Sequence, residues 1–212
     1  MTATSPLRTP ALTAAAPART LDIGVDLDGV CYDFVTGLRQ FIHATTARPL
    51  ESMPPALTWN FHAEQWGLSS GEFMSFFADG INAGHIFRHG DAYPGTVEAL
   101  GSLRAEGHRV HIVTARRIKG AEAAAEASTV AWLAEQGIEY ESLTFTADKD
   151  EVSTDIFVED HTDNYDVLDA AGNYPWLITR PWNHHHRARR VDSLDEFARV
   201  ARRLAAGDRE HA

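Results

Sequence analysis

Two acidic residues stand close together near the start of this chain, in the segment from residue 21 to residue 33. Asp26 and Asp28 follow a short apolar run that is typical of a buried strand, and Gly29 comes directly after them. Carboxylates held side by side at a strand end repel each other unless a cation neutralises them. Mg²⁺ suits such a place, because it takes a few protein oxygens and fills its other positions with water and phosphate oxygens.

Three further groups of polar residues follow apolar runs elsewhere in the chain. Thr114 ends one run and offers a hydroxyl group to a phosphoryl oxygen, and Lys149 follows another run with a charge that can offset developing negative charge. Glu159 and Asp160 end a third run and add two carboxylates that can bind a metal. These residue types together point to metal-assisted chemistry on a phosphate group.

Strand and helix patterns alternate around these residues. The pattern predicts strands at 21–27, 109–114, 142–146, 155–159 and 174–179, and helices at 95–106, 121–136, 163–171 and 193–204. A glycine follows each helix, Asp163 is expected to cap the third, and Val130 is expected to face inward from the second. The alternation predicts an α/β fold, a Rossmann-like parallel sheet with helices on both faces. Because ligands bind at the carboxyl ends of such strands, the polar groups should share one cleft.

Residues 35–92 interrupt this alternation and are rich in aromatic side chains. The segment is too long for a loop, so we expect a small helical cap inserted after the first strand and lying over the cleft. Residues 21–34 and 93–206 would then form the core domain. Residues 1–20 are rich in Ala, Thr and Pro and are expected to be a disordered tail.

The composition limits the partners. A net charge of −11 over 212 residues argues against a nucleic-acid polymer as ligand, and the sequence contains no apolar run long enough to span a membrane. Cys31 is the single cysteine, so no intrachain disulfide can form, and we expect a reducing cytoplasmic location. A small phosphorylated molecule is the expected substrate.

The four groups occur in the order found in the haloacid dehalogenase-like phosphatase superfamily, which the chain resembles over residues 21–180. The resemblance implies that Asp26 attacks phosphorus to form an aspartyl-phosphate, and that Asp28 acts as general acid and then as general base. It also implies Mg²⁺ bound by Asp26, Asp28 (through its backbone carbonyl) and Asp160, with Glu159 as a further or neighbouring ligand. The phosphate would lie against Gly29, Thr114, Ala115 and Lys149.

Within that superfamily, residues 26–34 are similar to the start of the cytosolic and mitochondrial 5′(3′)-deoxyribonucleotidases. The segments 93–95, 132–133 and 148–150 are similar as well. This resemblance implies a nucleoside monophosphate as substrate, Phe34 near the base, and a homodimer. Further contacts with the substrate are expected from Trp59, Phe61, Trp66, Phe77 and Arg116. Two departures stand out: Glu159 replaces the first Asp of an acidic pair, and Ala115-Arg116 replaces Ser-Pro.

Two other functions fit the same residues. The substrate could be another small phosphate, such as a sugar phosphate or an intermediate of a specialised pathway. The chain could instead be a catalytically silent binding module with the same fold. Against that alternative, the acids from Asp26 to Asp160 are all present, and a binding module has no need of both a nucleophile and an acid.

Overall fold

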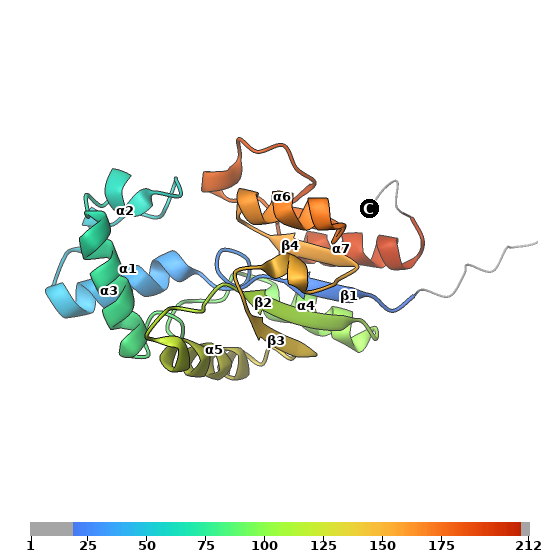
Figure 1. The fold of residues 1–212 in the computed structure, drawn as a ribbon, viewed down its shortest axis with the longest axis horizontal. Helices are drawn as coiled ribbons and strands as arrows, with labels where there is room; N and C mark the ends of the chain where they lie inside the picture. Colours follow the sequence, from blue (N-terminus) through green and yellow to red (C-terminus); the bar gives the residue numbers. More distant parts are fainter. Residues whose placement is uncertain (1–18, 209–212) are drawn as a thin grey trace, which may run out of the picture.

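The computed structural model describes residues 19–208, so residues 1–18 of the predicted tail lie outside the described residues. A parallel sheet of six strands runs through the molecule in the order β3-β2-β1-β4-β5-β6 (Figure 1). The strands are β1 (Asp22–Val25), β2 (Arg109–Thr114), β3 (Ser142–Phe145), β4 (Ile156–Glu159), β5 (Pro175–Ile178) and β6 (Arg190–Val191). The predicted parallel α/β sheet is confirmed. Strand β6 was not predicted, because two residues are too few to show a pattern.

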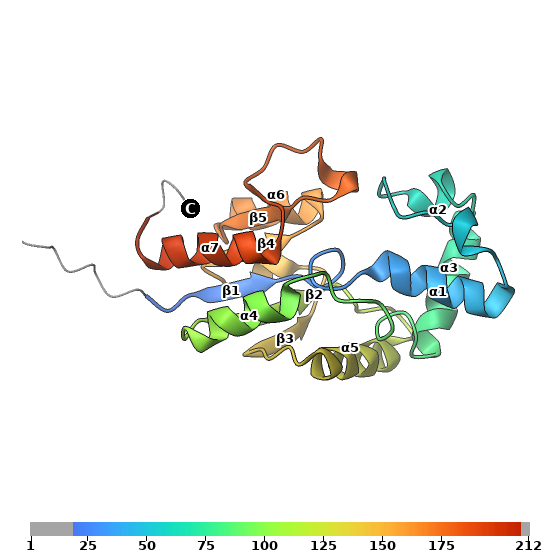
Figure 2. The same ribbon diagram turned by 180° about the vertical axis from the view of Figure 1, so that it is seen from behind.

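Helices cover both faces of the sheet. The buried cluster on one face includes side chains of α4 (Thr96–Ala105), α5 (Glu122–Gln136) and α7 (Leu194–Ala205). On the other face, Leu168 of α6 (Thr162–Ala171) packs against Val113 and Phe157. Seen from behind, α4 and α7 lie in front of the sheet and α6 lies beyond it (Figure 2).

Each predicted helix forms, with small differences at its ends. Glycines 107, 137, 172 and 207 adopt positive φ where the helices end, as predicted. The expectation for Asp163 was wrong: α6 starts at Thr162 with His161 as its N-cap, so Asp163 lies in the first turn. Val130 is exposed rather than inward, because Trp132 and Leu133 form the buried face of α5.

The order of the strands determines where a ligand can bind. The chain passes from β1 to β2 and β3 on one side, then crosses to β4 on the other side of β1. The carboxyl ends of β1 and β4 therefore lie at the switch point of the sheet, where ligands bind in folds of this type. Backbone pairing of Val25 with Val158 places Asp26 and Glu159 next to each other at that edge.

The segment between β1 and α4 is mainly helical and extends beyond the carboxyl edge of the sheet (Figure 1). It contains α1 (Phe34–Thr46), the 3₁₀ turn η1 (Leu50–Ser52), α2 (Phe61–Glu64) and α3 (Ser70–Asn82). These helices enclose a second hydrophobic cluster, which also includes Ala121 and Ala125 of the α5 region. The division into core and cap at residues 34 and 93 stays a prediction. Among the described residues, no helix has the length and apolar character needed to cross a bilayer.

Candidate active site

A tight loop presents the first acidic residues at the end of β1. The carbonyl of Leu27 accepts hydrogen bonds from the backbone N–H groups of Cys31 and Tyr32, both at 2.8 Å, and this closes the loop. Gly29 has a φ of 76°, and a Cβ at this position would lie 2.1 Å from Oδ2 of Asp160. Glycine is thus required here for its backbone conformation and for the close approach of Asp160.

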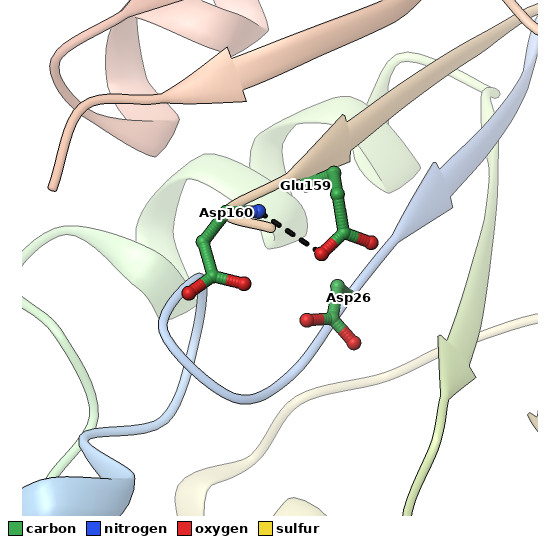
Figure 3. Close-up of side chains that lie close together, drawn as sticks. All are labelled: Asp26, Glu159 and Asp160. Atoms are coloured by element: carbon green, nitrogen blue, oxygen red, sulfur yellow. Dashed lines mark hydrogen bonds between the residues drawn. The ribbon is translucent and has the colours of Figure 1, made fainter. Parts of the chain in front are cut away.

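Three buried carboxylates meet at this edge of the sheet (Figure 3). One oxygen each from Asp26, Glu159 and Asp160 lies within 4.8 Å of the others. Lys149, in the 3₁₀ turn η2 (Lys149–Glu151), lies with Nζ 2.7 Å from Asp26 and 2.6 Å from Glu159. Three carboxylates and one ammonium leave two negative charges, which a divalent cation would balance. The all-oxygen donor set fits Mg²⁺.

The pKa values show how strongly these charges interact. Burial raises the pKa of Asp26 to about 7, against the lowering effect of Lys149. Burial and the neighbouring charges of Glu159 and Asp26 hold the pKa of Asp160 well above its usual range. The pKa of Glu159 is lowered in spite of burial, because Lys149 and the N–H of His161 stabilise its carboxylate. Without a cation, Asp26 and Asp160 thus retain protons more readily than ordinary acids do.

Both oxygens of Glu159 already have partners. Oε2 accepts from Lys149, and Oε1 accepts the backbone N–H groups of Asp160 and His161 at 3.1 and 3.0 Å. This arrangement orients the turn that carries Asp160 and holds Lys149 beside Asp26. It leaves Asp26 and Asp160 as the carboxylates with more freedom to bind a metal.

Arg116, for which contact with substrate was expected, lines the cavity, but its guanidinium is already paired with Asp28. Its guanidinium donates to both oxygens of Asp28, from Nε at 2.9 Å and from Nη2 at 2.7 Å. No feature of the sequence indicates this pair, whose members stand 88 residues apart.

The expected phosphate-binding residues take different positions around the cleft. Gly29, Ala115 and Lys149 line a cavity of about 430 Å³ that also contains Asp26 and Asp28. Thr114 is fully buried and does not line the cavity, and its Oγ1 has no hydrogen-bond partner among the described residues. A buried hydroxyl without a partner is uncommon in folded proteins, and the contact of Thr114 with phosphate stays a prediction.

The cap supplies an apolar wall to the same cavity. Phe34, Trp59 and Phe61 line it, as does Phe77, whose ring lies edge-on to that of Phe34 at 5.8 Å. The expectation for Trp66 was wrong. Its side chain is buried inside the cap cluster and does not line the cavity, and its indole N–H donates to the carbonyl of Pro54.

Several residues that the sequence did not single out complete the cavity. Trp182, in the 3₁₀ turn η3 (Pro181–Asn183) after β5, donates its indole N–H to Oδ2 of Asp160 at 3.0 Å. The ring of His161 lies 4.3 Å from that of Trp59 and so joins the core to the cap. Phe87 also lines the cavity. Trp182 follows a predicted strand, so the rule that ligands bind at strand ends would have been enough to flag it.

The sheet order, the acids at the ends of β1 and β4, and the inserted helices match the fold of haloacid dehalogenase-like hydrolases of known structure. A subfamily IA hydrolase from Geobacter sulfurreducens has this fold, with a TM-score of 0.57 and 15% identity over 89% of this chain and all of that chain. A predicted phosphatase from Clostridium acetobutylicum superposes with a TM-score of 0.54 and 16% identity over 84% of this chain and 96% of that one.

The sequence comparison is more specific. A Chlorobaculum tepidum protein with the provisional name 5′(3′)-deoxyribonucleotidase is 33% identical over 176 residues, which are 82% of this chain and 86% of that protein. Residues 19–205 match the model of the family described as 5′ nucleotidase, deoxy (pyrimidine), cytosolic type C. The chain belongs to this family and is an enzyme of the phosphatase class.

Proposed function

We propose that this enzyme hydrolyses the phosphate ester of 5′-nucleoside monophosphates, with deoxyribonucleotides as the preferred class. The observation that carries this proposal is a single cavity that is lined by Asp26 and Lys149 and also by the aromatic rings of Phe34 and Phe77. A nucleotide has a dianionic phosphate at one end and a flat base, whose faces stack on aromatic rings, at the other, and the two kinds of lining residue match those ends. The family and the 33% identical relative support the same substrate class.

Mg²⁺ is the proposed cofactor, held by Asp26, Asp160 and the backbone carbonyl of Asp28. The buried acids fit it, since their charge exceeds that of Lys149 by two and their donors are all oxygens. When bound, the ion supplies positive charge next to the phosphoryl oxygens and favours the ionised form of the acids around it. Glu159 keeps Lys149 and Asp160 in position rather than serving as a principal ligand.

The side chains then divide the reaction between them. A carboxylate oxygen of Asp26 attacks phosphorus, the bond from phosphorus to the ester oxygen breaks, and Asp28 gives its proton to the departing alkoxide. Water next attacks the aspartyl-phosphate, and Asp28 takes a proton from that water while phosphate leaves. Lys149 and the hydroxyl of Thr114 stabilise the charge on the transferred group. The cap excludes bulk water, which strengthens each of these interactions.

The setting of the enzyme is a proposal as well. A cytosolic location agrees with the family's description and with the presence of a single cysteine, Cys31, which is buried. Burial also raises the pKa of its thiol above the usual range. A homodimer is expected from the resemblance and can be checked by light scattering.

The test is phosphate release in the presence of Mg²⁺ from a panel of deoxynucleoside and ribonucleoside 5′-monophosphates and sugar phosphates. We expect deoxynucleotides to give the highest kcat/KM, and Asp26→Asn to abolish release. A preference for a sugar phosphate would overturn the nucleotide assignment alone. Release that persists undiminished in Asp26→Asn would overturn the mechanism.

A further inference from the structure

We infer that Arg116 is a positioning residue that holds the carboxyl group of Asp28 toward the reacting phosphoryl group and does not itself bind the phosphate. This inference rests on the proposed function, in which Asp28 transfers the proton. It concerns a residue for which the sequence suggested direct contact with substrate.

Arg116 and Asp28 form a bidentate ion pair. Nε of Arg116 lies 2.9 Å from Oδ2 of Asp28, and Nη2 lies 2.7 Å from Oδ1. Such parallel hydrogen bonds determine the plane of the carboxyl group as well as its position. Asp28 keeps about a third of its side chain exposed, and both residues line the cavity, so the oriented carboxyl group still faces the space where a substrate would bind.

Arg116 is itself immobilised. Only 1% of its side chain is exposed, and Cζ of its guanidinium lies 4.4 Å from the centroid of the Tyr32 ring and 4.3 Å from that of the Phe87 ring. Nη1 donates to Oγ1 of Thr129 at 3.2 Å, and that hydroxyl donates in turn to the carbonyl of Ala125. Two aromatic rings therefore pack against the guanidinium, and each of its three nitrogens has a partner.

These contacts distinguish two roles for Arg116, binding of the phosphate and positioning of Asp28. To bind a phosphate through Nε and Nη2, the guanidinium would have to release Asp28 and leave its contacts with the rings of Tyr32 and Phe87. In the observed position, the Nε–Nη2 edge of the guanidinium is occupied by Asp28, and Nη1 on its other edge donates to Thr129. The geometry thus assigns Arg116 to the carboxyl group of Asp28.

The chain contains a matched pair that serves as a control. At the opposite end of the same two strands, Arg109 donates to both oxygens of Asp22, from Nε at 2.6 Å and from Nη2 at 2.5 Å. Asp22 begins β1 and Arg109 begins β2, whereas Asp28 follows β1 and Arg116 follows β2. Arg109 is 49% exposed, and neither member of its pair lines the cavity.

The experiment compares Arg116→Met, Arg116→Lys and Arg109→Met by steady-state kinetics on the best nucleotide of the panel, together with inhibition by inorganic phosphate. For Arg116→Met we expect kcat to fall by roughly a hundred-fold, because a misplaced catalytic group costs about that much. KM and the inhibition constant of phosphate should change by less than about three-fold, since uniform binding is retained. Arg116→Lys keeps the positive charge but cannot make the bidentate contact, so it should recover part of kcat. Arg109→Met should have the kcat and KM of the wild type.

A double-mutant cycle with Arg116→Met and Asp28→Asn distinguishes the positioning role of Arg116 from a purely structural one. In the Asp28→Asn background, Arg116→Met should lower kcat no further, because the group that Arg116 positions has lost its proton-transfer function. If Arg116 binds phosphate, KM and the phosphate inhibition constant rise in both backgrounds, and that result would overturn the inference. If Arg116→Met fails to fold, Arg116→Lys decides: wild-type kcat in that variant contradicts the positioning role.

Failure of the inference can be told apart from failure of the proposed function. Wild-type enzyme that releases no phosphate, or an Asp28→Asn variant with full activity, overturns the proposed function and the role of Arg116 with it. Normal wild-type activity, a strongly impaired Asp28→Asn variant and an unimpaired Arg116→Met variant would overturn the role of Arg116 alone.

Discussion

The indole N–H of Trp182 donates a hydrogen bond to Oδ2 of Asp160 over 3.0 Å. Trp182 lies in η3 after β5, and Asp160 follows β4, so the bond ties two neighbouring strand ends together. The same Oδ2 lies against the backbone of Gly29. Asp160 is therefore oriented from two sides before any metal binds.

Replacing Trp182 with Phe should weaken Mg²⁺ binding by about ten-fold, because outer partners of metal ligands typically contribute that much. Isothermal titration calorimetry with MgCl₂ measures the effect directly. Trp66→Phe is the matched control, since its indole N–H bonds to the carbonyl of Pro54 inside the cap, away from the cavity. Equal affinities in the two variants would show that the Trp182 bond does not orient Asp160 for metal binding.

Gly29→Ala should abolish Mg²⁺-dependent turnover while leaving the fold intact. Its Cβ would lie 2.1 Å from Oδ2 of Asp160 and would push that carboxyl group out of place. Gly95→Ala separates this clash from backbone strain, because Gly95 has a similar φ of 80° and no atom within 4 Å of its would-be Cβ. Both variants should lose about 1 kcal/mol of stability from the left-handed backbone. Circular dichroism melts and Mg²⁺ titrations compare them, and retained Mg²⁺ binding in Gly29→Ala would contradict the prediction.

Stabilisation by Mg²⁺ should increase with pH. The pKa of Asp26 is raised to about 7 and that of Asp160 well above its usual range, so in the metal-free protein these two groups destabilise the fold as pH rises and they lose their protons. The lowered pKa of Glu159 contributes little change in this window, because that group is ionised throughout it. Mg²⁺ offsets the repulsion between the ionised acids, and its binding competes with protons.

The measurement for this prediction is the Tm with MgCl₂ and with EDTA, at about pH 5.5 and about pH 8. The gain from Mg²⁺ should be larger at the higher pH. NaCl at matched ionic strength controls for general screening of charge. An equal gain at both pH values would show that Asp26 and Asp160 do not titrate with the metal.

Phe77→Ala should raise KM for a nucleotide by roughly ten-fold to a hundred-fold, because a buried aromatic contact contributes about 1.5–3 kcal/mol. It should leave the kinetics with glycerol phosphate nearly unchanged, since that substrate has no base to pack against the ring. Phe76→Ala is the control: Phe76 stands next in sequence and packs on the cap cluster, but it does not line the cavity. A similar loss with both substrates would place Phe77 in a structural role.

The sequence predicted well which residues lie at the carboxyl edge of the sheet, because its signals are local. Apolar runs followed by Asp26, Thr114 and Glu159 mark strand ends, and a parallel sheet brings those ends to one edge. It predicted the cap less well. Which cap side chains reach the cavity depends on how the helices pack on one another, so the pattern did not show that Trp66 lies inside the cap cluster and that Phe87 lines the cavity.

By itself, therefore, the sequence determined the alternation of strands and helices and the order of the acidic groups, since both follow from patterns within a few residues. Only the tertiary structure decided how the charges pair. Arg116 meets Asp28, and Trp182 meets Asp160, across segments that are distant in the chain. Such contacts depend on which strands become neighbours and on how the cap packs over them, and these are properties of the whole fold.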